Sequence, residues 1–363
     1  MRKPAAAATP IVLKVGSSSL TLDEGGLDPE AVSRVVAQVK DVLDLGHPVV
    51  VVSSGAVAAG VPAMGLGRRP DDLPGLQVAA AVGQTRLMQR YADHFGEFGL
   101  VTGQVLLTRD ILANREQYLH ARDALARMRA FGIVPIVNEN DTVVVDELRF
   151  GDNDRLAAIV SHLVGAGMLV ILTDTAGLFS SDPRLADDAE FLSAIRHTDE
   201  ILDEIRGRSR SFGSGGVASK VSAARMAAWS GIPTVIANSD TGGTAAAAVA
   251  GEVVGTWIEP HESGVNARKL WVAFGLPSRG RLVIDDGAIE ALTGRGASLL
   301  AVGVTGVEGD FEAGDAVEVV DNSEELVGKG RVSVSADVLR EPGGHGSSDA
   351  GIAIHRDDLV VFV

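Results

Sequence analysis

The chain has 363 residues, of which 46% are hydrophobic and 22% charged, and it carries a net charge of −16. These values are typical of a globular protein with two or three domains, and the acidic balance disfavours charge-driven binding to nucleic acid or anionic membranes. The sequence has no cysteine, which excludes disulfides, thiolate zinc sites, iron–sulfur clusters and cysteine nucleophiles.

No apolar run approaches the roughly 20 residues that are needed to cross a bilayer. Near the N-terminus, Lys14 and Gly16 interrupt the apolar stretch that a signal peptide would require. We therefore expect a soluble, cytoplasmic protein that does not bind membranes. The lack of cysteine agrees with a reducing compartment.

Strand-like and helix-like segments alternate through the first two thirds of the sequence. Asp28 and Pro29 are typical of a helix start, and valines follow them at helical spacing as far as Leu43. This alternation indicates parallel βαβ units, so we predict an α/β fold: a three-layer αβα sandwich around a mainly parallel sheet. The expected strands lie in 11–15, 48–55, 100–107, 133–141, 168–178 and 233–238, and the expected helices are roughly 29–43, 77–95, 117–130, 153–165 and 217–230.

The pattern changes after residue 260, where EPHESGVNARK is typical of a linker. Short strand-like runs such as AVEVVD and RVSVS follow, with a single expected helix near 287–293. We predict a first domain over 1–262, a linker over 263–280 and a small, mostly β domain over 281–363.

Polar side chains follow the apolar runs where several predicted strands end. They are Lys14, Ser54, the segment Asn138–Asp141, and Thr173 with Asp174. Ligands of parallel sheets bind beyond the carboxyl ends of the strands, so these side chains are expected to meet at one edge. A turn explains Ser54 taken alone. Four polar strand ends at one edge favour a binding site.

The segment FGSGGVASK at 212–220 joins a glycine–serine loop to a lysine and an alanine-rich helix. Such glycines let backbone N–H groups approach phosphate oxygens, and a helix N-terminus favours an anion. A flexible surface loop with a solvated lysine explains the segment equally well. Asp152, in the segment GDNDRLAA, is explained on its own by N-capping of the helix that follows.

Together and in this order, the motifs resemble the amino acid kinase family and, within it, the glutamate 5-kinases. The resemblance rests on KVGSS, VVVSSGAVAAG, AAVGQTRLMQ, QVLLTRD, IVPIVNENDTV, GDNDRLAA, LTDTAGLFSSDPR and GSGGVASK. The later segments RGRLVIDDGA, GASLL and HRDD look like the PUA domain that many bacterial members carry. The resemblance therefore covers nearly the whole chain, with 1–262 as the catalytic domain.

The resemblance implies that ATP and L-glutamate react to give ADP and L-glutamyl 5-phosphate, the first step of proline biosynthesis. It also implies Mg²⁺ on the nucleotide phosphates, with no metal site formed by the protein alone. Feedback inhibition by proline and a homo-oligomer, a dimer or tetramer, are expected too. The labile acyl phosphate makes glutamate-5-semialdehyde dehydrogenase an expected partner.

The resemblance also assigns roles to individual residues. It implies that Asp152 holds the ammonium groups of two catalytic lysines, Lys14 and Lys220. The expected substrate-binding residues are Ser54, Gly55, Asp141 and Asn153. The expected nucleotide-binding residues are Lys14, Gly16, Thr173, Asp174, Ser214, Gly215, Gly216 and Lys220.

Elementary chemistry agrees with these roles. A glutamate carboxylate, with a reference pKa of about 4.3, is already ionised at neutral pH, so its attack on a phosphoryl group needs no general base. The difficulty is charge repulsion, which fixed cations such as Lys14 and Lys220 offset. Asp141 suits the substrate ammonium group, whereas Ser54 and Asn153 can donate to a carboxylate.

Two alternatives stay open at this point. PUA domains elsewhere bind RNA, but residues 281–363 hold six Lys and Arg against sixteen Asp and Glu, a net charge of −10. A domain this acidic is poorly suited to neutralising phosphates, so we do not expect RNA as a partner. The second alternative keeps the fold and changes the acceptor to aspartate, N-acetylglutamate, carbamate or a nucleoside monophosphate.

Overall fold

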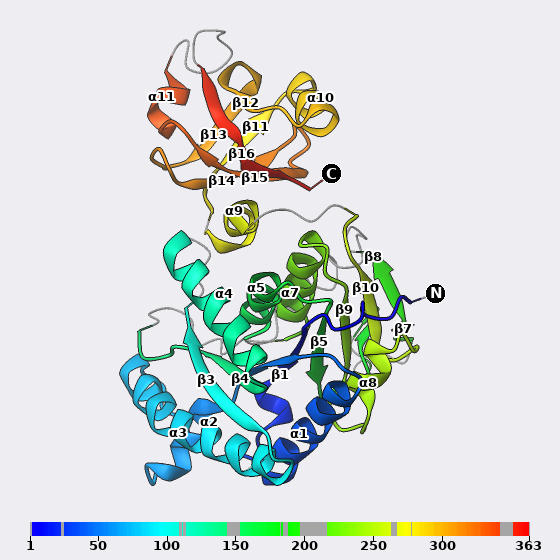
Figure 1. The fold of residues 1–363 in the computed structure, drawn as a ribbon. Helices are drawn as coiled ribbons and strands as arrows, with labels where there is room; N and C mark the ends of the chain where they lie inside the picture. The colour runs from blue at the N-terminus through cyan, green and yellow to red at the C-terminus, as the bar shows by residue number, and fades with distance from the viewer. Residues whose placement is uncertain are drawn as a thin grey trace. The chain divides into compact units, whose positions relative to one another are not determined.

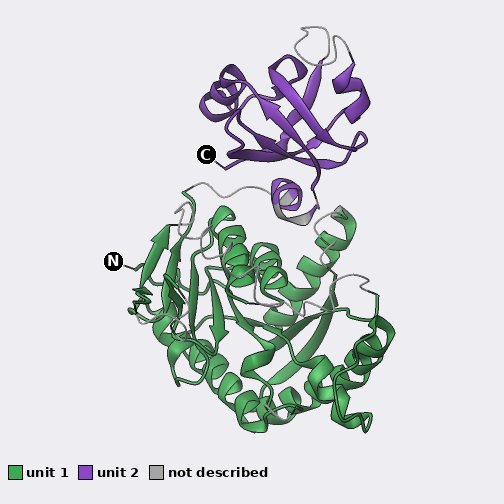
Figure 2. Cartoon of the chain, turned by 180° about the vertical axis from the view of Figure 1, so that it is seen from behind, with its two compact units in different colours: residues 1–264 green, residues 265–363 purple. Residues whose placement is uncertain are grey.

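The computed structural model describes residues 2–22, 25–108, 111, 114–143, 153–181, 183, 188–196, 216–262, 267–276, 278–341 and 351–362. The chain forms two compact units, Met1–Gly264 and Val265–Val363, which Figure 2 shows in green and purple. Each unit has its own sheet and its own hydrophobic core.

The first unit is built on an eight-stranded sheet in which neighbouring strands are parallel, except for the pair β9 and β10. In spatial order the strands are β3 (Val101–Leu107), β4 (Ile133–Glu139), β2 (Val49–Ser53), β1 (Ile11–Val15), β5 (Met168–Thr173), β9 (Thr234–Asn238), β10 (Thr256–Glu259) and β8 (Ala194–Arg196). The central strand β1 is buried along its whole length, as expected for a parallel strand covered on both faces.

Helices cover both faces of this sheet (Figure 1). One layer holds α1 (Pro29–Asp44), α3 (Leu73–Glu97) and α8 (Thr244–Val249). The other holds α4 (Arg115–Ala130), α5 (Asp154–Val164) and α7 (Val217–Trp229). This arrangement confirms the predicted α/β fold, a three-layer αβα sandwich with a mainly parallel sheet. The described part of the unit also contains a small hairpin of β6 (Leu178–Phe179) and β7 (Phe191–Leu192).

Local chemistry explains where the elements begin. Asp28 is the N-cap of α1, and its carboxylate accepts a hydrogen bond of 2.9 Å from the backbone N–H of Glu30. The valines of α1 then face the sheet and belong to the core of the unit. Other starts follow the same rule: Asp72 caps α3 and Asn114 caps α4.

Helix α2 (Ala56–Ala63) packs against α3 with backbone nearly touching backbone. A Cβ atom on Gly83 would lie 1.8 Å from the carbonyl oxygen of Ala56. In the same way, a Cβ atom on Gly60 would lie 1.9 Å from the carbonyl oxygen of Ala79. Real Cβ atoms do not approach so closely, so these two positions require glycine. Sequence periodicity did not predict α2, because glycine and Pro62 interrupt its short apolar run.

The second unit contains a six-stranded sheet in the order β12-β16-β15-β14-β11-β13. This confirms the predicted small, mostly β domain, although the single expected helix, now α10, is accompanied by α9 and α11. Its elements are α9 (Ala267–Leu270), a π-helical turn (Trp271–Gly275), β11 (Ser278–Ile284), α10 (Asp286–Arg295), β12 (Leu299–Leu300), β13 (Val304–Gly309), β14 (Ala316–Val320), β15 (Leu326–Val332), α11 (Ala336–Arg340) and β16 (Ile352–Val361).

The segment predicted as a linker, 263–280, is partly helical. Within it, α9 packs against β16, and the π-helical turn packs against β15 and β16. Elements of four or five residues are too short to show a hydrophobic period, so they could not be predicted from the sequence pattern. Across the described residues, no helix is both long and apolar enough to span a membrane.

Candidate active site

The carboxyl end of β1 carries a lysine whose ammonium group is buried. Lys14 is the fourth residue of the strand, and 2% of its surface is exposed. Side chains alternate between the two faces of a strand, so Lys14 lies on the face opposite to the core residues Leu13 and Val15. There it forms an ion pair with Asp154, the first residue of α5.

Asp154 also pairs with a second lysine. Lys220 lies in the first turn of α7, and its Nζ is 3.6 Å from Oδ2 of Asp154. Helices α5 and α7 are neighbours on one face of the sheet, so one carboxylate meets a lysine from a strand and a lysine from a helix. Buried charges are tolerated when they are paired.

This position of Asp154 differs from the sequence-based assignment, which gave both ion pairs to Asp152. Asp152 lies outside the described residues. Asp154 is in position to pair with the lysines because α5 begins there: Asn153 is the N-cap, and Asp154 is the first helical residue. A carboxylate in the first helical turn is also favoured by the helix dipole.

Gly16 keeps space open next to the Lys14 ammonium group. A Cβ atom at Gly16 would lie 3.4 Å from Nζ of Lys14. A larger side chain there would therefore cover the one charged atom that β1 brings to this edge. Gly16 is also the N-cap of the short 3₁₀ turn Ser17–Ser19.

An open cavity of about 160 Å³ lies at the same edge of the sheet. Its walls include all four residues that the sequence predicted to bind substrate: Ser54, Gly55, Asp141 and Asn153. Two charged residues of the wall were not predicted as site residues, Arg69 and Glu139. Glu139 ends β4 and was recognised only as part of a polar strand end.

The first turn of α2 forms another part of this wall, through Ala56, Val57 and Ala58. The residue before it, Gly55, has φ 97°, a left-handed conformation that favours glycine. The first N–H groups of a helix have no partner within the helix, and they attract anions. The wall therefore offers backbone donors to a carboxylate.

Beneath the cavity, the end of β2 is fixed by buried polar contacts. Asn153 donates from Nδ2 to the carbonyl oxygen of Ser53 at 2.6 Å. The Ser53 hydroxyl and the Tyr91 hydroxyl are 2.9 Å apart, and burial raises the pKa of Tyr91 to about 12. These contacts hold the backbone next to Ser54 in place.

The predicted nucleotide-side residues lie at the ends of neighbouring elements. Thr173 is the last residue of β5, and its hydroxyl donates to Oδ1 of Asp174 at 3.0 Å. Gly216 is the N-cap of α7, the helix that carries Lys220. Ser214 and Gly215 lie outside the described residues.

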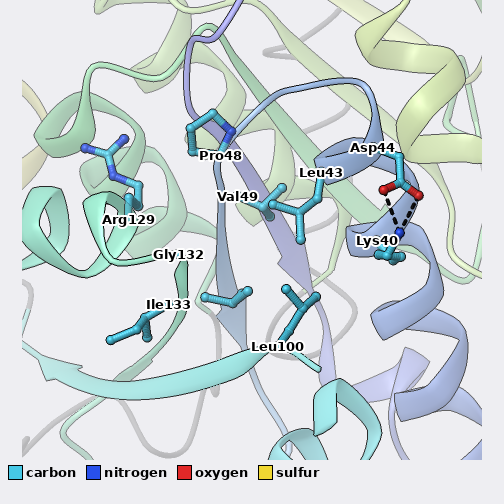
Figure 3. Close-up of a pocket in the computed structure, with 10 residues that line it drawn as sticks. Lys40, Leu43, Asp44, Pro48, Val49, Leu100, Arg129, Gly132 and Ile133 are labelled. Carbon is cyan, nitrogen blue, oxygen red and sulfur yellow. Dashed lines mark hydrogen bonds and ion pairs between the residues drawn. The ribbon is translucent and has the colours of Figure 1, made fainter. Parts of the chain in front are cut away.

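A larger cavity, of about 210 Å³, lies at the opposite edge of the sheet, where Val49 and Ile133 begin their strands (Figure 3). Its cations are already engaged: Lys40 is paired with Asp44 at 2.5 Å, and Arg129 donates from Nε to a carbonyl of its own helix. The predicted residues line the smaller cavity instead, so we take that one as the candidate active site.

Comparison with known proteins identifies the family of this chain. The model of the amino acid kinase family matches residues 9–238. The chain belongs to the amino acid kinase family. The model of the PUA domain matches residues 280–350, within the second unit.

Relatives within the amino acid kinase family match the whole length. A glutamate 5-kinase from Marinomonas sp. is 46% identical and covers 100% of both chains. A glutamate 5-kinase from Acinetobacter baumannii is 44% identical over 97% of this chain and 96% of its own. A solved structure of UMP kinase from Bacillus anthracis matches with a TM-score of 0.47 and 14% identity, over 70% of this chain and 97% of that one. The full-length matches place this amino acid kinase in the glutamate 5-kinase group.

Proposed function

We propose that this chain transfers the γ-phosphoryl group of ATP to the side-chain carboxylate of L-glutamate, the first step of proline biosynthesis. The products are ADP and L-glutamyl 5-phosphate. The observation that carries the proposal is the pairing of Lys14 and Lys220 through Asp154, beside the cavity that contains Ser54 and Asn153. The glutamate 5-kinase names of the full-length relatives support the choice of acceptor.

The two lysines supply the charge that the reaction requires. The attacking carboxylate and the transferring phosphoryl group are both anionic, and fixed cations must offset their repulsion. Asp154 balances one of the two ammonium charges and keeps both lysines in place before substrates bind. We assign Lys14 to the phosphoryl group from the side of β1 and Lys220 to the same group from the nucleotide side.

The cavity wall suits an amino acid with two carboxylates. Glu139 and Asp141 provide negative charge for the α-ammonium group. Among the described residues of the wall, Arg69 is the one cation, and we assign it to the α-carboxylate. The N-terminal turn of α2 and the hydroxyl of Ser54 add donors for carboxylate oxygens.

On the nucleotide side, we assign Thr173, Asp174, Gly216 and Lys220 to ATP, together with Ser214 and Gly215 from outside the described residues. Mg²⁺ commonly binds through substrate phosphates while keeping several of its waters. The exposed carboxylate of Asp174 offers the hard oxygen ligand that such an ion accepts. When bound, the ion would neutralise phosphate charge beyond the reach of the two lysines.

Regulation and assembly form a further part of the proposal. Proline carries the ammonium and α-carboxylate groups of glutamate without the reactive side chain, so it can occupy the same wall and compete with L-glutamate. We also propose a cytoplasmic homo-oligomer that hands its labile product to glutamate-5-semialdehyde dehydrogenase.

The deciding experiment measures ADP release with L-glutamate, L-aspartate, N-acetyl-L-glutamate and UMP as separate acceptors, with ATP and Mg²⁺ present. Hydroxylamine in the assay traps an acyl phosphate as a hydroxamate. We expect turnover and hydroxamate with L-glutamate alone, suppressed by proline. Turnover with a different acceptor would overturn the assignment of Ser54, Asp141 and Asn153.

A further inference from the structure

A chain of buried amide side chains leads from α3 to the candidate site. Asn153 donates from Nδ2 to Oδ1 of Asn138 at 2.6 Å. Asn138 donates from Nδ2 to Oε1 of Gln84 at 2.8 Å, and Gln84 donates more weakly to Oε1 of Gln104 at 3.4 Å. The first three side chains are 6%, 2% and 8% exposed, respectively, so water competes little for these bonds.

Two backbone groups fix the direction of this chain. The N–H of Glu139 can only donate, and it bonds to Asn138 at 2.9 Å, which identifies that atom of Asn138 as Oδ1. The carbonyl oxygen of Ser53 can only accept, so the atom of Asn153 that contacts it is Nδ2. Flipping either amide would place two donors or two acceptors against each other.

This direction determines what Asn153 can offer to a ligand. Its NH₂ group has two hydrogens, and the two short bonds to Ser53 and Asn138 use both. Its Oδ1 receives no hydrogen bond from any residue that the structure describes, and Asn153 lines the cavity. Asn153 therefore presents an acceptor there, which differs from the donor role that its residue type suggested in the sequence.

We propose that Oδ1 of Asn153 accepts a hydrogen bond from the α-ammonium group of L-glutamate, and that Gln84 is a positioning residue for this contact. The inference rests on the proposed function, because it assigns an atom of the substrate. Glu139 and Asp141 line the same cavity, so the acceptor stands among negative charges that suit an ammonium group. Without the acceptor oxygen of Gln84, Nδ2 of Asn138 loses this partner, and the Glu139 N–H and the Ser53 carbonyl alone hold the two amides less tightly in position.

The packing of α3 explains how a helix residue reaches this position. Gly83, next to Gln84, allows α3 to approach Ala56 of α2 at backbone contact. This brings Gln84 within hydrogen-bonding distance of Asn138 at the end of β4. This assigns a role to the motif AAVGQTRLMQ. Its glycine allows α3 to contact α2, and its glutamine holds the amide of Asn138.

The test uses substitutions at Gln84 that remove or keep the acceptor atom. Gln84→Met keeps the length of the side chain and removes the acceptor, whereas Gln84→Glu keeps an oxygen that accepts from Asn138. Gln84→Leu is a second acceptor-free variant in case the methionine variant does not melt cooperatively. Gln104→Met is the matched control, because it cuts the chain one link farther out and leaves Oε1 of Gln84 in place.

Two ligands provide the readout, L-glutamate as substrate and glutarate, which lacks the ammonium group, as a competitive inhibitor. We expect Gln84→Met to raise the KM for L-glutamate about tenfold, the size of one hydrogen bond to a charged group. The Ki of glutarate and the KM of ATP should change less than about twofold, since neither ligand touches Asn153 through an ammonium group. Gln104→Met should resemble the wild type, and Gln84→Glu should have a lower KM for L-glutamate than Gln84→Met.

The outcomes separate this inference from the proposed function. If the wild type does not phosphorylate L-glutamate, the proposed function fails first. If it does, an unchanged KM for L-glutamate in both acceptor-free variants overturns the role of Gln84. A Ki for glutarate that rises in parallel with that KM also overturns it, because a merely structural role would affect both ligands equally.

Discussion

Lys14 and Asp154 form an ion pair from which water is almost excluded, with 3% and 0% of their side chains exposed. Such a pair is weak evidence for stability, because desolvation of two charges offsets much of their attraction. A second lysine, Lys220, approaches the same carboxylate at 3.6 Å. Because such a pair adds little to folding, we relate the cluster of two lysines and one carboxylate to phosphoryl transfer.

Substituting Asp154 by Asn should affect both turnover and stability. The amide preserves the shape and removes the charge, which leaves two lysines without their shared partner. We expect the unfolding free energy to fall by about 3–5 kcal/mol, the usual cost of breaking a buried pair from one side. Turnover should fall by on the order of a thousandfold, because the lysines lose their fixed positions. Urea unfolding and initial rates measure the two effects.

The matched control for this change is Asp152→Asn, two residues earlier in the chain. If Asp154 holds the lysines, the control should retain most of the stability that D154N loses. A stability loss in D152N as large as that in D154N would return the pairing role to Asp152.

Arg69 should contribute to substrate binding rather than to chemistry. Arg69→Gln removes the cation of the cavity wall, and we expect the KM for L-glutamate to rise about tenfold or more with little change in kcat. The neighbouring Arg68 provides the control, because its side chain is 86% exposed and pairs only loosely with Asp71, at 3.5 Å. Equal kinetics for R69Q and R68Q would contradict the assignment.

Much of the fold could be predicted because its elements follow strong local rules. Strands β2 and β5 are apolar runs that end in a serine or threonine, β1 is apolar except for Lys14, and α1 combines a capped start with valines at helical spacing. The elements that could not be predicted are short ones such as α2, α9 and α11. With four to eight residues, they are too short to show a hydrophobic period. Such elements form through packing against neighbours, which a local pattern does not contain.

The residues of the candidate site could be predicted where a polar side chain directly follows an apolar strand. Lys14 and Ser54 follow apolar runs, so their positions could be expected before the structure was known. Asp154 could not be distinguished from Asp152, because the two acidic residues stand on either side of Asn153 in the sequence and the exact start of α5 was not predictable. Gln84 gave no local signal, since a glutamine within a helix is ordinary and its partner Asn138 is 54 positions away.

Gly83→Ala should destabilise the first unit strongly. The added methyl group would lie 1.8 Å from the carbonyl oxygen of Ala56, so α2 and α3 must separate. We expect a loss of about 3 kcal/mol or more, as for severe overpacking, together with a higher KM for L-glutamate. On the same helix, Gly96→Ala has open space and should stabilise the protein by about 0.5–1 kcal/mol. Similar melting temperatures for the two variants would show that the helices can separate without cost.

The second unit contains a carboxylate that should make its stability depend on pH. Asp358 of the HRDD segment bonds to Arg268 at 2.6 and 2.7 Å and to Arg331 at 3.3 Å, which ties α9 and β15 to β16. Burial alone would raise the pKa of Asp358, but the hydrogen bonds and charges of both arginines outweigh it and lower that pKa below the usual 3.8. The ionised form is therefore favoured in the folded state.

A lowered pKa in the folded state stabilises the protein above the pKa of the unfolded chain, and this contribution disappears as pH falls through the folded value. We expect the second unit to lose stability as the pH falls below about 5, and Asp358→Asn to be less stable at pH 7 with a flatter dependence. Trp271 is a local reporter, because Arg331 lies 5.7 Å from the centre of its ring. Its fluorescence can be isolated by replacing Trp229 and Trp257, the other two tryptophans, with phenylalanine. Parallel pH profiles for the D358N variant and its parent would show that the arginine contacts do not hold this carboxylate ionised.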